Sequence, residues 1–181
     1  MIICVGSVFL DHIIKIDKFP KKPIKIIANN IEKRLGGSAA IAACTISKLG
    51  NKSKLFTKLG NDEAKLFLLK ELNKFSVDLS SIITLENTNS SQSYVFEESK
   101  GERLLAAFNE KKLVDYKKLP KIELNKKHLY LADLRWINAT SYLANQCVKN
   151  NLDLVVDLDN FKTNNIIRSI VKKASYPIFS E

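Results

Sequence analysis

The chain has 181 residues and carries 29 Lys and Arg against 19 Asp and Glu, so its formal net charge is +10. A hydrophobic fraction of 45% and a charged fraction of 27% are typical of globular proteins and exclude a disordered chain. The length suits one domain with its own core. No apolar run approaches the roughly 18 residues that span a bilayer, and the first residues do not have the pattern of a signal peptide.

The excess positive charge has two interpretations. It resides in 25 Lys and only 4 Arg, which are spread along the chain. Proteins that read nucleic acid sequence rely on Arg for bidentate contacts to bases. We therefore favour a solvated basic surface over a nucleic-acid-binding patch.

The three cysteines, Cys4, Cys44 and Cys147, stand far apart among apolar neighbours. Their odd number and the absence of a CxxC motif argue against a disulfide framework and a zinc site. We expect them to be small buried side chains in a protein of the reducing cytoplasm.

Apolar stretches with an alternating pattern predict strands in the first part of the chain. A short buried strand at 2–6 ends in glycine. Ile-rich stretches at 13–17 and 24–34 predict extended strands separated by Pro20 and Pro23.

Helices and strands then alternate. Small residues over 39–48 predict a helix that approaches a sheet closely and has Gly50 just past its end. A strand is predicted at 53–59. Asp62 is placed to cap a helix from 63 to about 74, whose apolar residues share one face.

The rest of the chain combines a hairpin with further βα units. The hairpin is predicted at 93–98 and 103–108, after a strand at 79–85. Further strands are predicted at 128–132, 153–157 and 176–179, and helices at 138–150 and 163–174. This alternation implies a mostly parallel sheet flanked by helices, an open α/β fold. The segments 13–34 and 93–108 are expected to form a separate small β lid.

Ligands of open α/β sheets bind beyond the carboxyl ends of the strands. Gly36, Gly37 and Ser38 begin the first helix, where backbone N–H groups favour a polar or anionic ligand. A tight turn that only packs the helix on the sheet explains them equally well. Asp11 lies shortly after the strand at 2–6, where a carboxylate can accept two sugar hydroxyls. By itself, it is more readily explained as an ordinary loop acid.

Asp133, Arg135 and Trp136 follow a strand in the same way. The first two form either an ion pair or ligand contacts, and the indole either stacks on a ligand or packs. Asp157 and Asp159 close the next strand, but two acids at this spacing are a weak signal for a metal.

His12 and His128 have no partner spacing that indicates a site, and we interpret both as structural or surface residues. The sequence contains no P-loop, no nucleophile elbow, no HExxH and no EF-hand pattern.

Together these segments resemble the N-terminal portion of the ribokinase/PfkB family of sugar kinases. Gly6 followed by Asp11 is similar to the opening strand and its sugar-binding acid. Gly36–Gly37 and the following helix resemble the first family signature, and residues 59–62 resemble the Gly-x-Asp element that comes next. The hairpin with residues 100–103 resembles the second half of the family's lid. The amino-acid sequences of residues 8–11, 131–136 and 154–157 resemble those of the ketohexokinase-like branch.

The resemblance implies a Rossmann-like core with a β lid that closes over the sugar and often mediates dimers. It implies ATP-dependent phosphorylation of a sugar hydroxyl, with ATP and Mg²⁺ as cofactors. The substrate-binding residues carried over are Asp11, Gly36, Gly37, Ser38 and Arg135. Glu181 falls where the family has a stretch near the magnesium and phosphate region. The family's Gly-Ala-Gly-Asp segment, which supplies the catalytic base, is expected beyond Glu181, so no catalytic residue is assigned here.

Three positions depart from the family pattern. Ile41 replaces an Asn that contacts sugar, Lys65 replaces a Gly, and Phe9 stands where ribokinases have a polar sugar ligand. We therefore expect residues 1–181 to be a single incomplete domain without turnover of its own. The alternative is a non-catalytic remnant that still binds sugar or dimerises. In both cases the strand at 176–179 is left as an apolar edge, which favours aggregation.

Overall fold

The computed structural model describes residues 1–118, 121–159 and 164–179. The core strands are β1 (Ile2–Val5), β4 (Ser53–Gly60), β5 (Asp78–Leu85), β8 (Leu129–Asp133), β9 (Leu154–Asp157) and β10 (Tyr176–Ile178). The core helices are α1 (Ser38–Lys48), α2 (Glu63–Asn73), α4 (Ile137–Asn150) and α5 (Asn165–Lys173), with a short 3₁₀ turn η1 (Leu134–Trp136). The lid strands are β2 (Phe9–Ile16), β3 (Asn30–Gly36), β6 (Gln92–Glu98) and β7 (Arg103–Phe108), followed by the one-turn helix α3 (Lys111–Val114).

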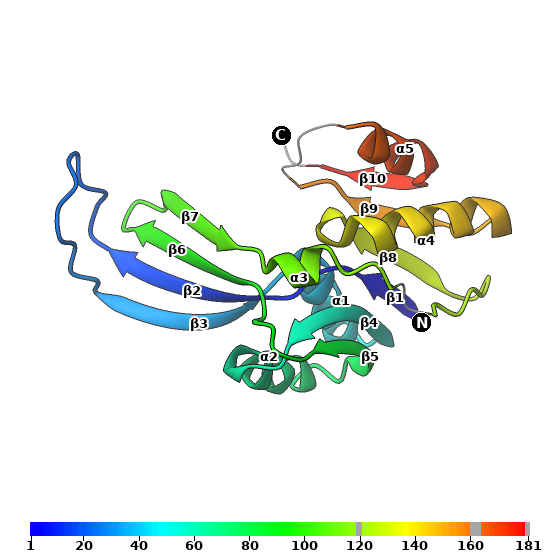
Figure 1. The fold of residues 1–181 in the computed structure, drawn as a ribbon, viewed down its shortest axis with the longest axis horizontal. Helices are drawn as coiled ribbons and strands as arrows, with labels where there is room; N and C mark the ends of the chain where they lie inside the picture. The colour runs from blue at the N-terminus through cyan, green and yellow to red at the C-terminus, as the bar shows by residue number, and fades with distance from the viewer. Residues whose placement is uncertain (119–120, 160–163, 180–181) are drawn as a thin grey trace.

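The described residues form two sheets, which Figure 1 shows as a core with a lid projecting from it. The core sheet has the strand order β10-β9-β8-β1-β4-β5 and all its strands are parallel. The lid sheet has the order β3-β2-β6-β7. The prediction of a mostly parallel α/β sheet with a small β lid is confirmed.

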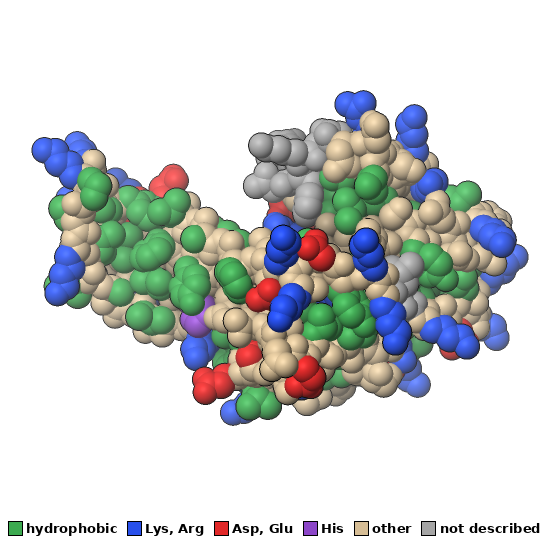
Figure 2. Space-filling model, viewed as in Figure 1, with side chains coloured by type: hydrophobic (Ala, Val, Ile, Leu, Met, Phe, Trp, Pro, Cys, Tyr) green, Lys and Arg blue, Asp and Glu red, His purple; other side chains and the backbone are tan. Residues whose placement is uncertain are grey.

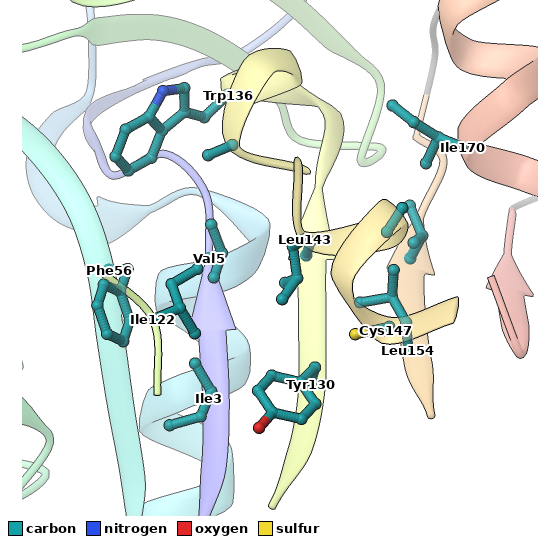
Figure 3. Close-up of a cluster of buried hydrophobic side chains, with 14 of the residues drawn as sticks. Ile3, Val5, Phe56, Ile122, Tyr130, Trp136, Leu143, Cys147, Leu154 and Ile170 are labelled. Atoms are coloured by element: carbon teal, nitrogen blue, oxygen red, sulfur yellow. The ribbon is translucent and has the colours of Figure 1, made fainter. Parts of the chain in front are cut away.

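The core sheet is buried on both faces of its central strands. Ile3 and Val5 of β1 point into one cluster, with side chains of α4 and α5, and Figure 3 shows them beside Tyr130 and Leu143. Cys4, between them in sequence, points into the opposite cluster, with side chains of α1 and α2. This explains why β1 is a continuous apolar run, as strands of parallel sheets are.

The ends of α1 and α2 lie where the sequence predicts them. Gly50 follows α1 with a φ of 83°, a conformation that favours glycine. Asp62 caps α2, because its carboxylate accepts the backbone N–H of Lys65 at 3.0 Å.

Two parts of the lid differ from the prediction. Strand β2 begins at Phe9, so Asp11 lies within a lid strand and not in a loop. Residues 24–29 lie outside the strands, and β3 begins only at Asn30. The stretch between the strands contains Pro20 and Pro23, which lack the N–H that a ladder requires. Helix α3, which follows the lid, was not predicted.

The cysteines lie where the composition indicates. Cys4, Cys44 and Cys147 are all buried and free. Within the described ranges, no helix is long and apolar enough to cross a membrane.

Candidate functional site

A cavity of about 180 Å³ lies between the lid and the core. Its wall on the lid side is formed by Phe9, Asp11, Ser93, Leu105 and Ala107. Its wall on the core side is formed by Gly37, Ser38, Ile41, Arg135 and Asp159. The core residues follow the carboxyl ends of strands or begin α1, which is the edge where ligands of open α/β sheets bind.

Asp11 is the half-buried carboxylate of this cavity. The hydroxyl of Ser93, on the neighbouring strand β6, donates to its Oδ1 at 2.5 Å. Burial raises the pKa of Asp11, while the Ser93 hydrogen bond and the charge of His12 oppose that rise. A carboxylate has acceptor sites for several donors, so Asp11 can also accept hydroxyl groups of a ligand.

Gly36 lies directly against this carboxylate. A Cβ atom at position 36 would lie 2.1 Å from Oδ2 of Asp11. The first glycine of the pair therefore does not line the cavity itself but makes room for the acid that does.

Gly37 caps α1 in a left-handed conformation, with a φ of 97°. A Cβ atom here would lie 2.2 Å from the carbonyl oxygen of Ser7. The second glycine thus lets the start of α1 approach the end of β1. It places Ser38, at the positive end of the helix dipole, on the cavity wall.

Arg135 reaches the cavity from η1. Its guanidinium carbon lies 6.0 Å from the centroid of the Phe9 ring. Asp133, two residues earlier, is only 2% exposed and its carboxylate accepts three backbone N–H groups. Asp133 does not line the cavity and its carboxylate is occupied by backbone N–H groups, so the structure does not support a ligand contact for it. Trp136 is 1% exposed and packs in the core, as Figure 3 shows.

The five predicted substrate-binding residues are thus brought together around one cavity, four on its wall and Gly36 behind Asp11. Glu181, which the resemblance places near the nucleotide, lies outside the described residues. Sequence reasoning did not single out Ser93, because its role depends on the pairing of β2 with β6, where Asp11 lies opposite Ser93.

The acids after β9 do not form a metal centre by themselves. Asp157 Oδ1 accepts the backbone N–H of Asp159 at 3.0 Å. In the part of the chain that the structure describes, no three His, Cys, Asp or Glu side chains are grouped to hold a metal ion.

The two histidines agree with a structural interpretation. His12 Nε2 lies 2.8 Å from Gln92 Oε1, and its ring stacks on that of Tyr94 at 4.6 Å. The ring of His128 lies 6.5 Å from that of Tyr130. Neither histidine lines the cavity.

The model of the "pfkB family carbohydrate kinase" matches residues 1–175. The chain therefore belongs to the PfkB family, and the family resemblance seen in the sequence is confirmed.

Individual relatives agree with this assignment. A nucleoside kinase of Methanocaldococcus jannaschii is 30% identical over 95 residues, which are 52% of this chain and 32% of that protein. Its crystal structure, at 18% identity, superposes with a TM-score of 0.82 over 98% of this chain and 60% of that one. An Arabidopsis thaliana ribokinase complexed with ribose and ATP, at 17% identity, gives 0.78 over 98% and 59%. The chain thus spans less than two thirds of the length of these relatives.

Proposed function

We propose that the chain is the sugar-binding portion of an ATP-dependent carbohydrate kinase of the ketohexokinase-like branch. The observation that carries the proposal is the Asp11–Ser93 pair on the wall of a cavity between the core and the β lid. In this account Asp11 accepts sugar hydroxyls, and Ser38 and Arg135 contact the sugar from the core side. Gly36 and Gly37 allow the close approach that these contacts need.

The chemistry of the cavity wall supports a sugar ligand. The wall combines a carboxylate, a hydroxyl and a guanidinium with the apolar side chains of Phe9, Ile41 and Leu105. Sugars have both hydroxyl groups and apolar ring faces, so this mixture matches them. Among the solved relatives, one holds ribose and ATP and a Burkholderia thailandensis nucleoside kinase holds inosine.

The phosphoryl donor in this proposal is ATP with Mg²⁺. Besides Asp11, the cavity wall includes Asp159, and the backbone N–H of Asp159 donates to Oδ1 of Asp157 at the end of β9. These residues do not by themselves fit a nucleotide–metal site, so we derive no catalytic step through them. We place the catalytic base outside residues 1–181, and we place the protein in the cytoplasm on account of its three buried free thiols.

The alternative is a non-catalytic module, a single incomplete domain that binds sugar or dimerises through the lid. Leu104 and Phe108, on one face of the edge strand β7, are about half exposed, and Figure 2 shows hydrophobic side chains gathered over the lid. A second copy covering this strand would bury them.

Calorimetric titration with fructose, ribose and inosine tests the proposal. We expect saturable binding of at least one of them, weakened about tenfold or more in Asp11→Asn, because the neutral amide loses the charge-assisted bonds. Asp17→Asn, a change at an acid just past the end of β2, should leave the affinity unchanged. The proposal would be contradicted if none of the three compounds binds, or if Asp11→Asn binds with the same affinity as the parent.

Sugar-dependent ADP release from the same protein separates the two candidates. We expect no sugar-dependent ADP release from residues 1–181 alone, whether or not sugar binds. Turnover that depends on both sugar and ATP would show that these residues suffice for catalysis.

A further inference from the structure

The chain passes between the core and the lid four times. The crossings are residues 6–8 between β1 and β2, Gly37 between β3 and α1, 86–91 between β5 and β6, and 109–110 between β7 and α3. Because the cavity has one wall in each sheet, its shape depends on how these four crossings are held.

Asp133, at the end of β8, holds the first two crossings. Its Oδ2 accepts the backbone N–H of Ser7 at 3.1 Å and that of Ala39 at 3.2 Å. Its Oδ1 accepts the N–H of Arg135 at 2.9 Å, which fixes the carboxylate itself. Gly6 brings the first crossing against this acid, since a Cβ atom there would lie 2.2 Å from Oδ2.

Lys58, in the buried strand β4, holds the fourth crossing. It is 5% exposed, and its Nζ donates to the backbone carbonyl of Leu113 in α3. The ammonium lies 4.4 Å from the centroid of the Trp136 ring. Burial lowers the pKa of Lys58 to about 8, and the negative charge of Asp133 opposes this shift.

The third crossing is held in the same region, just past the end of β4. Asp62 accepts both the N–H and the hydroxyl of Ser90, each at 2.8 Å. The Ser90 oxygen in turn accepts the N–H of Gly60 at 3.1 Å. All four crossings are therefore tied to side chains at the carboxyl ends of β4 and β8.

A buried charge is an expensive way to gain stability. Replacing buried ionic groups by apolar side chains of similar volume is often neutral or stabilising, so stability does not explain why Lys58 stands near the carboxyl end of the buried strand β4. What an apolar side chain cannot provide is a directed bond to the carbonyl at the end of the lid. The bonds that Lys58 and Asp133 make at the lid crossings explain why charged side chains are buried at these two positions.

We propose that Asp133 and Lys58 form a buried anchor that sets the position of the lid over the cavity, which makes both of them positioning residues. This role of the anchor in positioning the lid does not depend on which ligand the cavity binds. The consequence for ligand affinity rests on the proposed function.

Spin labels on the two bodies measure the lid position directly. Lys100→Cys places one label at the turn between β6 and β7, and Lys149→Cys places the other on α4, both at exposed sites of the full chain. The three native cysteines are buried. We expect a narrow distance distribution by double electron–electron resonance, and a clearly broader one after Lys58→Met.

Lys54→Met is the matched control, because Lys54 lies on the same strand but pairs with Asp78 of the core at 3.3 Å. It should leave the distribution as narrow as in the parent. The melting temperature of Lys58→Met should not fall, since Met keeps the apolar stem and removes a buried charge. Equal distributions in the two folded variants would overturn the role of Lys58.

Asp133→Asn tests the other half of the anchor, also if Lys58→Met fails to fold. Hydrogen exchange at the amides of Ser7 and Ala39 should accelerate about tenfold or more, while the amide of Leu55 in the core remains protected. Unchanged exchange at Ser7 and Ala39 would overturn the role of Asp133.

A ligand measurement connects the anchor to the cavity. The affinity of Lys58→Met for the sugar that binds the parent should fall about tenfold, although Lys58 itself does not line the cavity. If the parent binds no sugar, the proposed function fails, whereas the label distances still decide whether the anchor exists.

Discussion

Two carboxylates near the cavity illustrate how surroundings assign different tasks to the same side chain. Asp11 is half buried, has one side-chain hydroxyl as partner and lies on the cavity wall. Asp133 is almost fully buried and its oxygens are occupied by three backbone N–H groups. The first is suited to meet a ligand and the second to hold the chain.

The pKa of Asp133 gives a test at this scale. Burial raises it from 3.8 to about 6, against the hydrogen bonds and the charge of Arg135. The folded state then holds the proton of Asp133 more tightly than the unfolded state does. The bound proton therefore adds to the free energy of unfolding below pH 4, and this contribution is lost as the pH rises through 6. The loss corresponds to about 3 kcal/mol.

Urea unfolding of the parent and of Asp133→Asn between pH 4 and 7 measures this contribution. The free energy of unfolding of the parent should fall relative to that of the variant by about 2 kcal/mol between pH 4 and 7. A difference between the two proteins that does not change with pH would show that Asp133 has an ordinary pKa in the folded state.

At the level of residues, the sequence identified the acid and the glycine pair but not their partners. Gly36–Gly37 could be found because paired glycines at a helix start are a local signal, whereas Asp11 was selected through the family resemblance, since by itself it was more readily explained as a loop acid. Ser93 and Lys58 could not be found, because a serine in a strand and a lysine in a strand acquire roles only through register and burial.

At the scale of elements, the junction of β3 with α1 depends on Gly37. The φ of 97° alone strains any other residue, and a side chain would also meet the carbonyl of Ser7. Gly50, past the other end of α1, has a similar φ of 83° but nothing within 4 Å of its Cβ position. A side chain at position 50 would therefore meet backbone strain alone, whereas a side chain at position 37 would meet both backbone strain and a steric clash.

Alanine substitutions at these glycines should differ in cost. Gly50→Ala should lower the free energy of unfolding by about 1 kcal/mol, through backbone strain alone. Gly37→Ala should cost about 3 kcal/mol or more, because the clash adds to the strain. Chemical denaturation of both variants checks this. An equal loss in the free energy of unfolding would mean that the junction of β3 with α1 can shift to accommodate a side chain at position 37 without a further energetic cost.

The elements themselves were largely predictable, since strands and helices in the core follow clear apolar patterns and caps. The boundaries in the lid were not. β2 begins at Phe9 because the chain runs from β1 through Gly6 into the lid, a connection that tertiary pairing sets: the N–H of Leu10 bonds to Ser91. Helix α3 has only four residues, too few for a periodic signal.

At the scale of the whole molecule, the core sheet is unevenly covered. Its outer strand β10 exposes Tyr176 at 58% and Ile178 at 55%, and Phe179 just after it at 71%. Strands of parallel sheets are normally covered on both faces, and an open apolar edge invites pairing with another chain. The predicted apolar edge at 176–179 is present in the structure.

This edge should govern the behaviour of residues 1–181 in solution. We expect the isolated chain to aggregate, and Ile178→Lys to raise the monodisperse fraction in size-exclusion chromatography, because a charge blocks edge pairing. Ile166→Lys, at an equally exposed position on α5, should not. A parent chain that is already a monodisperse, cooperatively melting monomer would contradict this.

The central claim is that the cavity between lid and core, with Asp11 on its wall, binds a sugar. A heteronuclear NMR titration of the full chain with fructose, ribose and inosine tests it most directly. The account predicts saturable shifts for at least one of them, concentrated at the backbone amides of Ser38, Ser93 and Leu105 and lost in Asp11→Asn. Shifts that fall elsewhere, or none with any of the three compounds, would contradict it.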